Sequence, residues 1–241
     1  SRGGLPINIV DSSTMKQSKV LSLLHGPVDL GEHPIPANPR IEGYPGVAWD
    51  QHMLLFDTAT CNSHEFFLVR SPNALTNFWW ADSGYRLDMR SNKANKGSAA
   101  ASGFSMLAGL VRYDEVAAGR IDHAVGFSLP IISNLPPVWP ATGTDGKSDT
   151  PNAPRMGMMF RLRADTDLSS MGPTARLIAK AMQTHGAILS DSNQSGFAIG
   201  GENDDRWDDA DLATLSKLTA SDFEVIDPTP MKVADDSYAI R

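Results

Sequence analysis

An aspartate and a histidine stand two residues apart in the segment WDQHMLLFDTATCNSHEFFLV. On a strand, Asp50 and His52 face the same side, because successive side chains alternate between faces. A carboxylate beside an imidazole suits proton transfer, since the acid fixes the imidazole tautomer and raises its basicity. We therefore expect Asp50 and His52 to be catalytic, with Glu65 on the next strand as a further catalytic candidate. The alternative is a hydrogen-bonded structural pair at the mouth of the strand.

A charged strand face is predicted in the segment WWADSGYRLDMRSN. Arg86, Asp88 and Arg90 alternate with apolar residues, so they share one face of a strand. We expect Asp88 to be catalytic and both arginines to bind substrate, because a guanidinium matches the carboxylate of a sugar acid. Trp80 is expected to stack on a sugar ring. The alternatives are ion pairs on a solvated face and a tryptophan that packs in the core or at an edge.

A third candidate, His123, lies on an apolar face of the strand predicted over Ile121–Leu129. We expect it to bind substrate if it lies near His52 across the sheet, and the alternative is a hydrogen-bonded core histidine. The sequence has no HExxH or CxxC motif and no cofactor is predicted, although a metal site built from Asp50, His52 and His123 stays open. Cys61, the single cysteine, is expected to be a buried thiol rather than a nucleophile.

Short strands must hold these residues, because Asn, Ser, Gly and Pro interrupt the apolar segments at close intervals. An antiparallel arrangement is expected, since most connections are too short for crossover helices. The exception is the long loop Pro136–Pro154, which we expect to be functional. The predicted strands are Ile7–Val10, Val20–Leu24, His52–Asp57, Glu65–Arg70, Phe78–Arg90, Phe104–Val111, Ile121–Leu129, Met156–Arg163, Ala187–Ser190, Phe197–Ile199 and Phe223–Ile226, with a turn at Ala117–Gly119.

Two helices are predicted late in the chain. Pro173–His185 begins with proline, which suits the first helical position, and it stops at Gly186. Trp207–Leu218 carries aspartates in its first turn, where they complement the helix dipole. Together these patterns predict a mainly β fold, an antiparallel β-sandwich or jelly roll with two peripheral α-helices near the C-terminus.

The length of 241 residues suits a single domain. We expect a Pro-rich N-terminal strap with short strands over residues 1–48, a β-sheet core over residues 49–165, and helices with closing strands over residues 166–241. Within the strap, His33–Gly46 should lie ordered against the sheet, because its prolines favour an extended path. Ile35, Ile41 and Tyr44 are its expected apolar anchors.

Composition excludes several classes of protein. The net charge is −7, so the basic surface that binds nucleic acid is not expected. No apolar run approaches the roughly 20 residues of a membrane helix, so no membrane span is predicted. The first residues, SRGGLPINIV, lack the features of a signal peptide, and we expect a secreted or periplasmic protein whose leader has been removed or lies outside this sequence.

Several motifs carry a family resemblance. They are HPIPANPRIEG, DQHMLLFD, WWADSGYRLDMRSN, GLVRYDEVAAGRIDHAVGFSLP, WPA and DDRWDDADL. Their order resembles a widespread family of largely secreted bacterial proteins of unassigned function. The resemblance implies secretion and a single β-rich domain, but it implies no particular activity. This chain departs from the family in the segment ATGTDGKSDT after WPA, which has no histidine.

These observations favour a secreted carbohydrate-active enzyme that cleaves a polysaccharide or oligosaccharide. A glycoside hydrolase needs two carboxylates about 5–10 Å apart, and the candidates are Asp50, Asp57, Glu65 and Asp88. A polysaccharide lyase needs a base, such as His52 or His123, and an arginine that neutralises a uronate. The alternative function is a non-catalytic glycan-binding or surface-interaction protein with the same fold.

Overall fold

The computed structural model describes residues 3–22, 31–43, 50–73, 75, 77–95 and 97–241. The structure is mainly β, with 29% of residues in strands and 16% in helices, which confirms the coarse fold prediction. The strands are β1 (Ile7–Val10), β2 (Ser18–Ser22), β3 (Glu32–His33), β4 (Met53–Asp57), β5 (Asn62–Phe67), β6 (Trp79–Ala81), β7 (Ser83–Asp88), β8 (Val125–Leu129), β9 (Met159–Leu162), β10 (Ala187–Ser192), β11 (Ala198–Ile199) and β12 (Phe223–Ile226). The helices are α1 (Met106–Gly109), α2 (Tyr113–Ala117), α3 (Pro173–Thr184) and α4 (Asp209–Leu212), with 3₁₀ turns at Ala213–Lys217, Ala220–Asp222 and Thr229–Met231.

The strands form three mixed sheets, with strand orders β1-β4-β5-β7, β11-β8-β10-β9-β12 and β3-β2-β6. The pairs β1–β4, β8–β10 and β2–β6 are parallel, so the prediction of a purely antiparallel fold is wrong. A parallel pair needs a long connection, and the connection between β8 and β10 contains β9 and α3. A sandwich or jelly roll is not confirmed.

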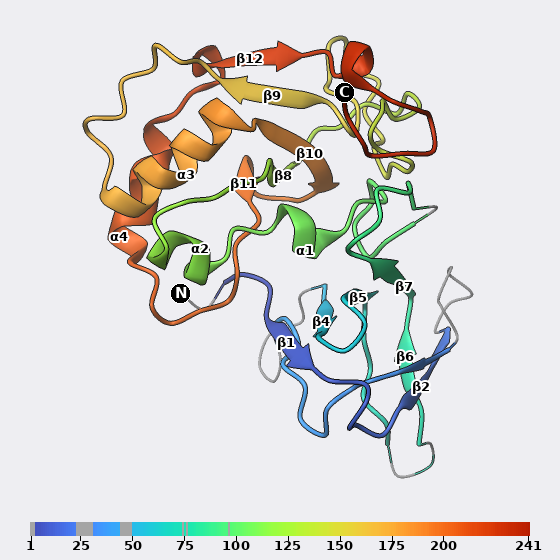
Figure 1. The fold of residues 1–241 in the computed structure, drawn as a ribbon. Coiled ribbons are helices and arrows are strands. Elements are labelled where there is room, and N and C mark those ends of the chain that lie inside the picture. The colour runs from blue at the N-terminus through green and yellow to red at the C-terminus, as the bar shows by residue number, and fades with distance from the viewer. Residues whose placement is uncertain (1–2, 23–30, 44–49, 74, 76, 96) are drawn as a thin grey trace.

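The described residues pack around two hydrophobic cores within one mainly β domain. The first core lies among β1 to β7, and the second lies between α3 and the five-stranded sheet, with α1 between the two groups (Figure 1). Ile35 and Ile41 are buried in the first core, so these two strap anchors are confirmed. Tyr44 lies outside the described residues.

Helix α1 replaces the strand that was predicted over Phe104–Val111. The hydroxyl of Ser105 caps it by accepting a hydrogen bond from the amide of Ala108, at 3.2 Å. At the other end, a Cβ on Gly109 would approach the backbone of Gly126 to 3.2 Å. Glycine therefore lets α1 pack closely against β8, and the apolar run serves a buried turn of helix rather than a strand.

Three other local predictions need correction. The turn predicted at Ala117–Gly119 is present, but it follows helix α2 instead of joining two strands. The first turn of α2 is closed by the carboxylate of Glu115, which accepts from the amide of Arg112. The long helix Trp207–Leu218 is α4 followed by a 3₁₀ turn. The strand Phe78–Arg90 is divided into β6 and β7. By contrast, α3 matches its prediction to within one residue.

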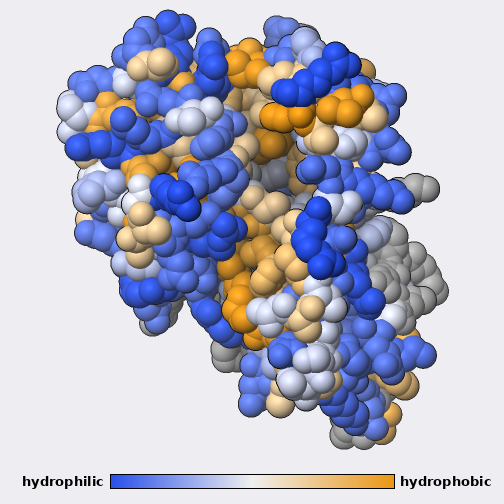
Figure 2. All heavy atoms as spheres, viewed as in Figure 1, coloured by the Kyte–Doolittle hydropathy of each residue, from blue (hydrophilic) through white to orange (hydrophobic). Residues whose placement is uncertain are grey.

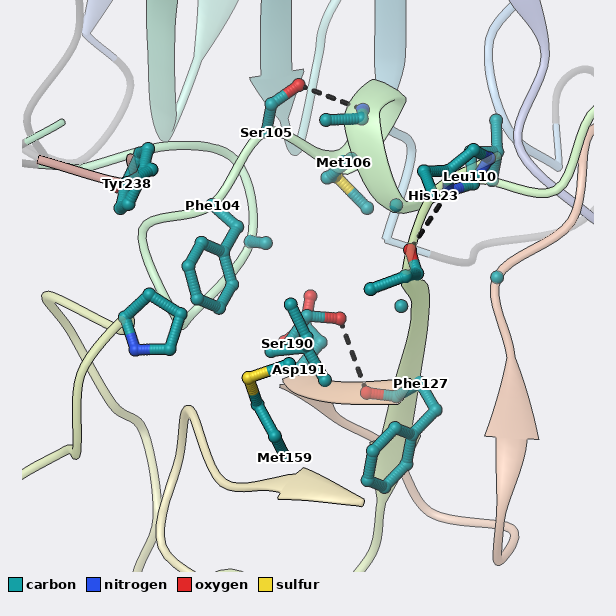
Figure 3. A pocket seen from close by; sticks show the side chains of 18 of the residues that line it. Phe104, Ser105, Met106, Leu110, His123, Phe127, Met159, Ser190, Asp191 and Tyr238 are labelled. Atoms are coloured by element: carbon teal, nitrogen blue, oxygen red, sulfur yellow. Dashed lines mark hydrogen bonds between the residues drawn. The ribbon is translucent and has the colours of Figure 1, made fainter. Parts of the chain in front are cut away.

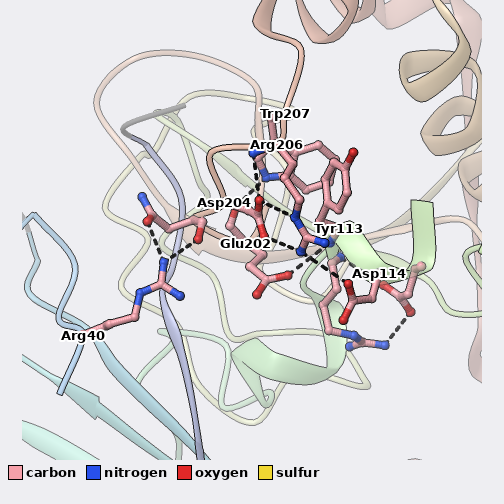
Figure 4. Close-up of polar contacts among 10 residues, drawn as sticks. Arg40, Tyr113, Asp114, Glu202, Asp204, Arg206 and Trp207 are labelled. Carbon is pink, nitrogen blue, oxygen red and sulfur yellow. Dashed lines mark hydrogen bonds and ion pairs between the residues drawn. The ribbon is translucent and has the colours of Figure 1, made fainter. Parts of the chain in front are cut away.

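Polar contacts join the Pro-rich strap to the second half of the chain (Figure 4). The guanidinium of Arg40 donates to the backbone oxygen of Asn203 at 2.7 Å and to its side-chain oxygen at 2.9 Å. Nearby, Arg206 pairs with Asp204 at 2.6 Å and lies over the ring of Tyr113, 4.1 Å from its centroid. The contacts of Arg40 join the two groups of strands on one side of the molecule, and those of Arg206 fix the segment before α4 against α2.

Candidate functional site

A cavity of about 960 Å³ lies where the two groups of strands meet, and we call it the central cavity. Figure 2 shows it as a hollow with hydrophobic residues in its depth and hydrophilic residues around it. One wall comes from the first half of the chain and includes Glu42, His52 and Asp88. The other comes from α1, β8, β9, β10 and the C-terminal segment. A cavity of this size, with a few polar groups in an apolar lining, is typical of a ligand site.

His52 is a buried polar side chain of the cavity wall with a fixed orientation. It is 5% exposed, and its Nδ1 lies 2.8 Å from Oε2 of Glu42. The pairing is reinforced along the backbone, because the amide of Glu42 donates to the carbonyl of His52 at 2.9 Å. Glu42, rather than the predicted Asp50, therefore orients this imidazole. The second ring nitrogen, Nε2, is buried and has no hydrogen-bond partner among the described residues.

Charge around His52 favours the imidazolium form. Burial alone would lower the pKa of His52, but the hydrogen bond and charge of Glu42, with the charges of Asp191 and Asp50, outweigh burial. The pKa of His52 is therefore raised above 6.5. A protonated imidazole that keeps Nε2–H unpartnered is suited to donate a proton to a substrate.

Asp191, near the end of β10, lies across the cavity from the first half of the chain. Burial raises its pKa to about 6, although the amides of Ser192 and Ala101 and the charge of His52 act in the opposite direction. The amide of Ser192 donates to its carboxylate at 2.9 Å. A carboxyl group with a pKa near neutrality can take up or release a proton at physiological pH. Asp191 and His52 thus form an electrostatically coupled acid–base pair.

The long loop Pro136–Pro154 contributes to the site. Trp139 and Pro140 line the central cavity, and the carboxylate of Asp145 accepts a hydrogen bond from the hydroxyl of Ser192, next to Asp191. The loop therefore contributes to the cavity wall and also contacts the strand end that carries Asp191.

The depth of the cavity is apolar (Figure 3). Phe104, Met106 and Met159 line it, and Tyr238 reaches it from the C-terminal segment. Ser190 lies among them, and its hydroxyl donates to the carbonyl of Phe127 at 3.3 Å. Apolar surface can contact the C–H faces of a pyranose ring, and carboxylates beside it can accept hydrogen bonds from the hydroxyl edges.

Four of the residues selected from the sequence line this cavity: Asp50, His52, Asp88 and His123. Strand alternation does not explain the first two, because β4 begins at Met53 and Gln51 has a left-handed φ of 51°. Asp88 also pairs with Arg90 at 3.3 Å. His123 is held by Glu115, with 3.2 Å between Nε2 and Oε1.

The other predicted site residues lie outside the lining of the central cavity. Glu65 is fully buried, and its carboxylate accepts hydrogen bonds from the hydroxyl of Ser105 at 2.5 Å and the amide of Met106 at 2.8 Å. Asp57 is also buried, and hydrogen bonds from Thr60 and Ser12 help to lower its pKa to about 2 against the effect of burial.

The predicted substrate-binding residues of the charged strand are also outside the lining. The guanidinium of Arg86 donates to the carbonyl of Glu32 at 2.8 Å, and Arg90 is exposed beside Asp88. Trp80 is partly buried on β6, where its backbone pairs with Arg70. These side chains therefore do not surround one substrate with His52.

Sequence reasoning missed Glu42 and Asp191. Glu42 lies in the Pro-rich strap, ten positions before His52, where no periodic pattern connects the two. Asp191 lies in the strand ILSDS, where the spacing of apolar residues indicates a strand but no chemistry. Its place directly after the predicted strand Ala187–Ser190 is the signal that the sequence offers, whereas the register shift between β10 and β8 at this point is visible only in the structure.

Among the residues that the structure describes, no group of three or more His, Cys, Asp or Glu side chains is arranged to hold a metal ion. Asp50, His52 and His123 are thus not gathered into a metal site. Cys61 is partly buried rather than fully buried. No helix in the described ranges is long and apolar enough to cross a membrane.

Comparisons of the chain with protein-family models, with curated proteins and with solved structures found no match. The family resemblance of the motifs therefore stays a prediction. A functional proposal has to rest on the chemistry of the central cavity.

Proposed function

We propose that the protein is an extracytoplasmic carbohydrate-active enzyme that cleaves a polysaccharide by general acid–base catalysis. The observation that carries this proposal is the pair formed by His52 and Asp191 on the wall of the central cavity. Both pKa values are raised, for different reasons: Glu42 raises the pKa of His52 against the effect of burial, and burial raises the pKa of Asp191 to about 6. Enzymes use groups with such pKa values as acids and bases.

Hydrolysis is the reaction that this pair supports best. The imidazolium of His52 donates its Nε2 proton to the glycosidic oxygen as the bond to the anomeric carbon breaks. The carboxylate of Asp191 accepts a proton from the water whose oxygen forms the new bond to that carbon. Glu42 keeps the imidazole oriented and charged before transfer. Proton exchange with solvent then restores both groups.

The charges of the cavity favour a hydrolase over a lyase. A lyase that acts on uronates must neutralise a carboxylate, and arginine is the usual partner. Arg161 lines the cavity, but it is bound to Glu224 at 2.6 Å. The wall also carries Asp50, Asp88 and Asp191, which repel an acidic polymer. We therefore propose a neutral or basic glycan as the substrate.

A panel of neutral, basic and uronate-containing polysaccharides tests this proposal. The account predicts new reducing ends on a neutral or basic glycan and no unsaturated uronate product. Unsaturated product from a uronate polymer would establish a lyase instead. Saturable binding without any product would favour the alternative of a glycan-binding protein, and it would contradict the catalytic assignment.

A further inference from the structure

A second cavity, of about 740 Å³, lies on the side of the five-stranded sheet that faces α4, and we call it the apolar cavity. Aromatic rings from β8, β9 and β12, and from Phe197 just before β11, form one side. Phe127 contacts Phe160 and Phe197, with ring centroids 5.5 and 5.2 Å apart, and Phe197 contacts Phe223 at 6.0 Å. The opposite side comes from α4 and the 3₁₀ turn that follows it.

Several hydrophobic residues around this cavity are incompletely buried. Phe160, Trp207, Leu215 and Phe223 pack against the second core, yet each is only partly buried, and Phe197 is 50% exposed. Protein interiors normally contain few voids larger than a water molecule, and a large apolar concavity marks a binding site. A cavity of this size beside the second core therefore has room for an apolar occupant.

Polar groups in the wall define the chemistry of that occupant. The carboxylate of Glu202 accepts from the amide of Tyr113 at 3.1 Å, and its carbonyl accepts from the indole of Trp207 at 2.7 Å. The hydroxyl of Ser216 donates to the carbonyl of Ala213 at 2.7 Å. These polar groups already have partners within the protein, so they do not require a polar ligand. The negative charge of Glu202 also opposes an anionic ligand.

We propose that the apolar cavity binds an uncharged small molecule with a hydrocarbon skeleton, at a site separate from the catalytic pair. Its volume lies within the range of about 300–1,000 Å³ that small-molecule sites occupy. Burial of hydrocarbon surface supplies the binding free energy. A fatty-acid anion is disfavoured, because its carboxylate would lose solvation near Glu202 without gaining a cation.

Titration of the protein with Nile red, an uncharged fluorescent dye, tests the proposal. We expect saturable binding with one dye per chain and a blue-shifted emission. Decanol should displace the dye at a concentration at least about tenfold lower than decanoate. The absence of saturable binding would overturn the proposal, and so would equal displacement by the two competitors.

Matched variants locate the dye. Ser216 lines the apolar cavity, whereas Ser221 is an exposed serine of the next 3₁₀ turn that does not line it. Ser216→Phe should raise the dye's dissociation constant at least about tenfold, and Ser221→Phe should change it by less than about twofold. Ala108→Phe narrows the central cavity alone and should have no effect. If Ala108→Phe weakened dye binding and Ser216→Phe left it unchanged, the dye would lie in the central cavity and the inference would be overturned.

Discussion

At the scale of single residues, catalysis by His52 requires that its imidazole stay charged inside the protein. Burial opposes its charge, and Glu42 provides the largest opposing effect. Glu42→Gln should therefore lower the pKa of His52. If His52 is the acid, the fall in kcat/KM on the alkaline side should move to lower pH. A pH–rate profile measures this shift.

The matched control is Glu115→Gln, because Glu115 pairs with the other histidine of the cavity wall, through Nε2 of His123, and not with His52. We expect the alkaline limb to stay in place in this variant. An equal shift in both variants, or none in Glu42→Gln, would remove His52 from the role of acid.

Burial of the charged Asp191 carboxylate, which its proposed function requires, lowers the stability of the folded protein. Its pKa is raised from 3.8 to about 6, so the folded state binds a proton more tightly than the unfolded chain. Stability therefore falls as pH rises between these two values, and the loss is complete above the higher one. Asp191→Asn removes this loss, and we expect a gain of roughly 1–3 kcal/mol in the free energy of unfolding at about pH 8. The gain should vanish at about pH 3, below both pKa values.

Urea unfolding at the two pH values measures this effect. Asp149→Asn is the control, because Asp149 is exposed and lies outside the cavity lining, and this change should alter stability by no more than about 0.5 kcal/mol. A loss of stability in Asp191→Asn at the higher pH would contradict the stated cause of the pKa shift.

Sequence patterns could locate only part of this residue-scale picture. Asp50 and His52 were found because a carboxylate and an imidazole stand close together in the chain. Glu42 and Asp191 reach the same cavity only through folding, since one lies in an irregular strap and the other on a strand of the distant sheet. The role of Glu65 was misjudged for the same reason, because its partners on α1 lie forty positions away.

At the scale of elements, Glu65 connects β5 to α1. Burial raises its pKa, and hydrogen bonds from Ser105 and Met106 act against burial. Glu65→Ala leaves these donors without an acceptor inside the protein. We expect the free energy of unfolding to fall by on the order of 3 kcal/mol. Thermal or urea unfolding measures the loss.

A surface glutamate provides the comparison for this prediction. Glu224→Ala removes an exposed ion pair with Arg161 and should cost no more than about 1 kcal/mol. Equal losses in the two variants would show that Glu65 does not hold α1 in place. Because Glu65 lies outside the cavity lining, Glu65→Gln should leave the pH–rate profile unchanged.

Local patterns predicted some elements well. β1 and β12 match their predicted ranges, because short β-type segments between turn residues mark them clearly. α3 matches to within one residue, because proline at its start and glycine after its end mark the helix. Phe104–Val111 was predicted as a strand because a short apolar run does not distinguish a strand from a buried helical turn. The capping of α1 by Ser105 and its packing on Gly126 determine the outcome.

At the scale of the whole molecule, the central cavity exists because two hydrophobic cores meet without merging. Short connections suggested antiparallel pairing throughout, whereas the structure pairs β1 with β4 and β8 with β10 in parallel. Such pairings depend on packing between distant segments, which no local pattern contains. The cavity brings His52 from one group of strands to Asp191 from the other, so neither group alone holds the complete acid–base pair.

The most direct test of this account is the rate at which new reducing ends appear on the best neutral or basic glycan of the panel, for wild type, His52→Ala, Asp191→Asn and the double variant. We predict that each single change lowers kcat/KM by on the order of 10²–10⁴. The fold-decrease in kcat/KM of the double variant should be much smaller than the product of the two single fold-decreases, because the pair acts as a unit. Full activity in a folded His52→Ala protein, or independent and small effects of the two changes, would contradict a catalytic site in the central cavity.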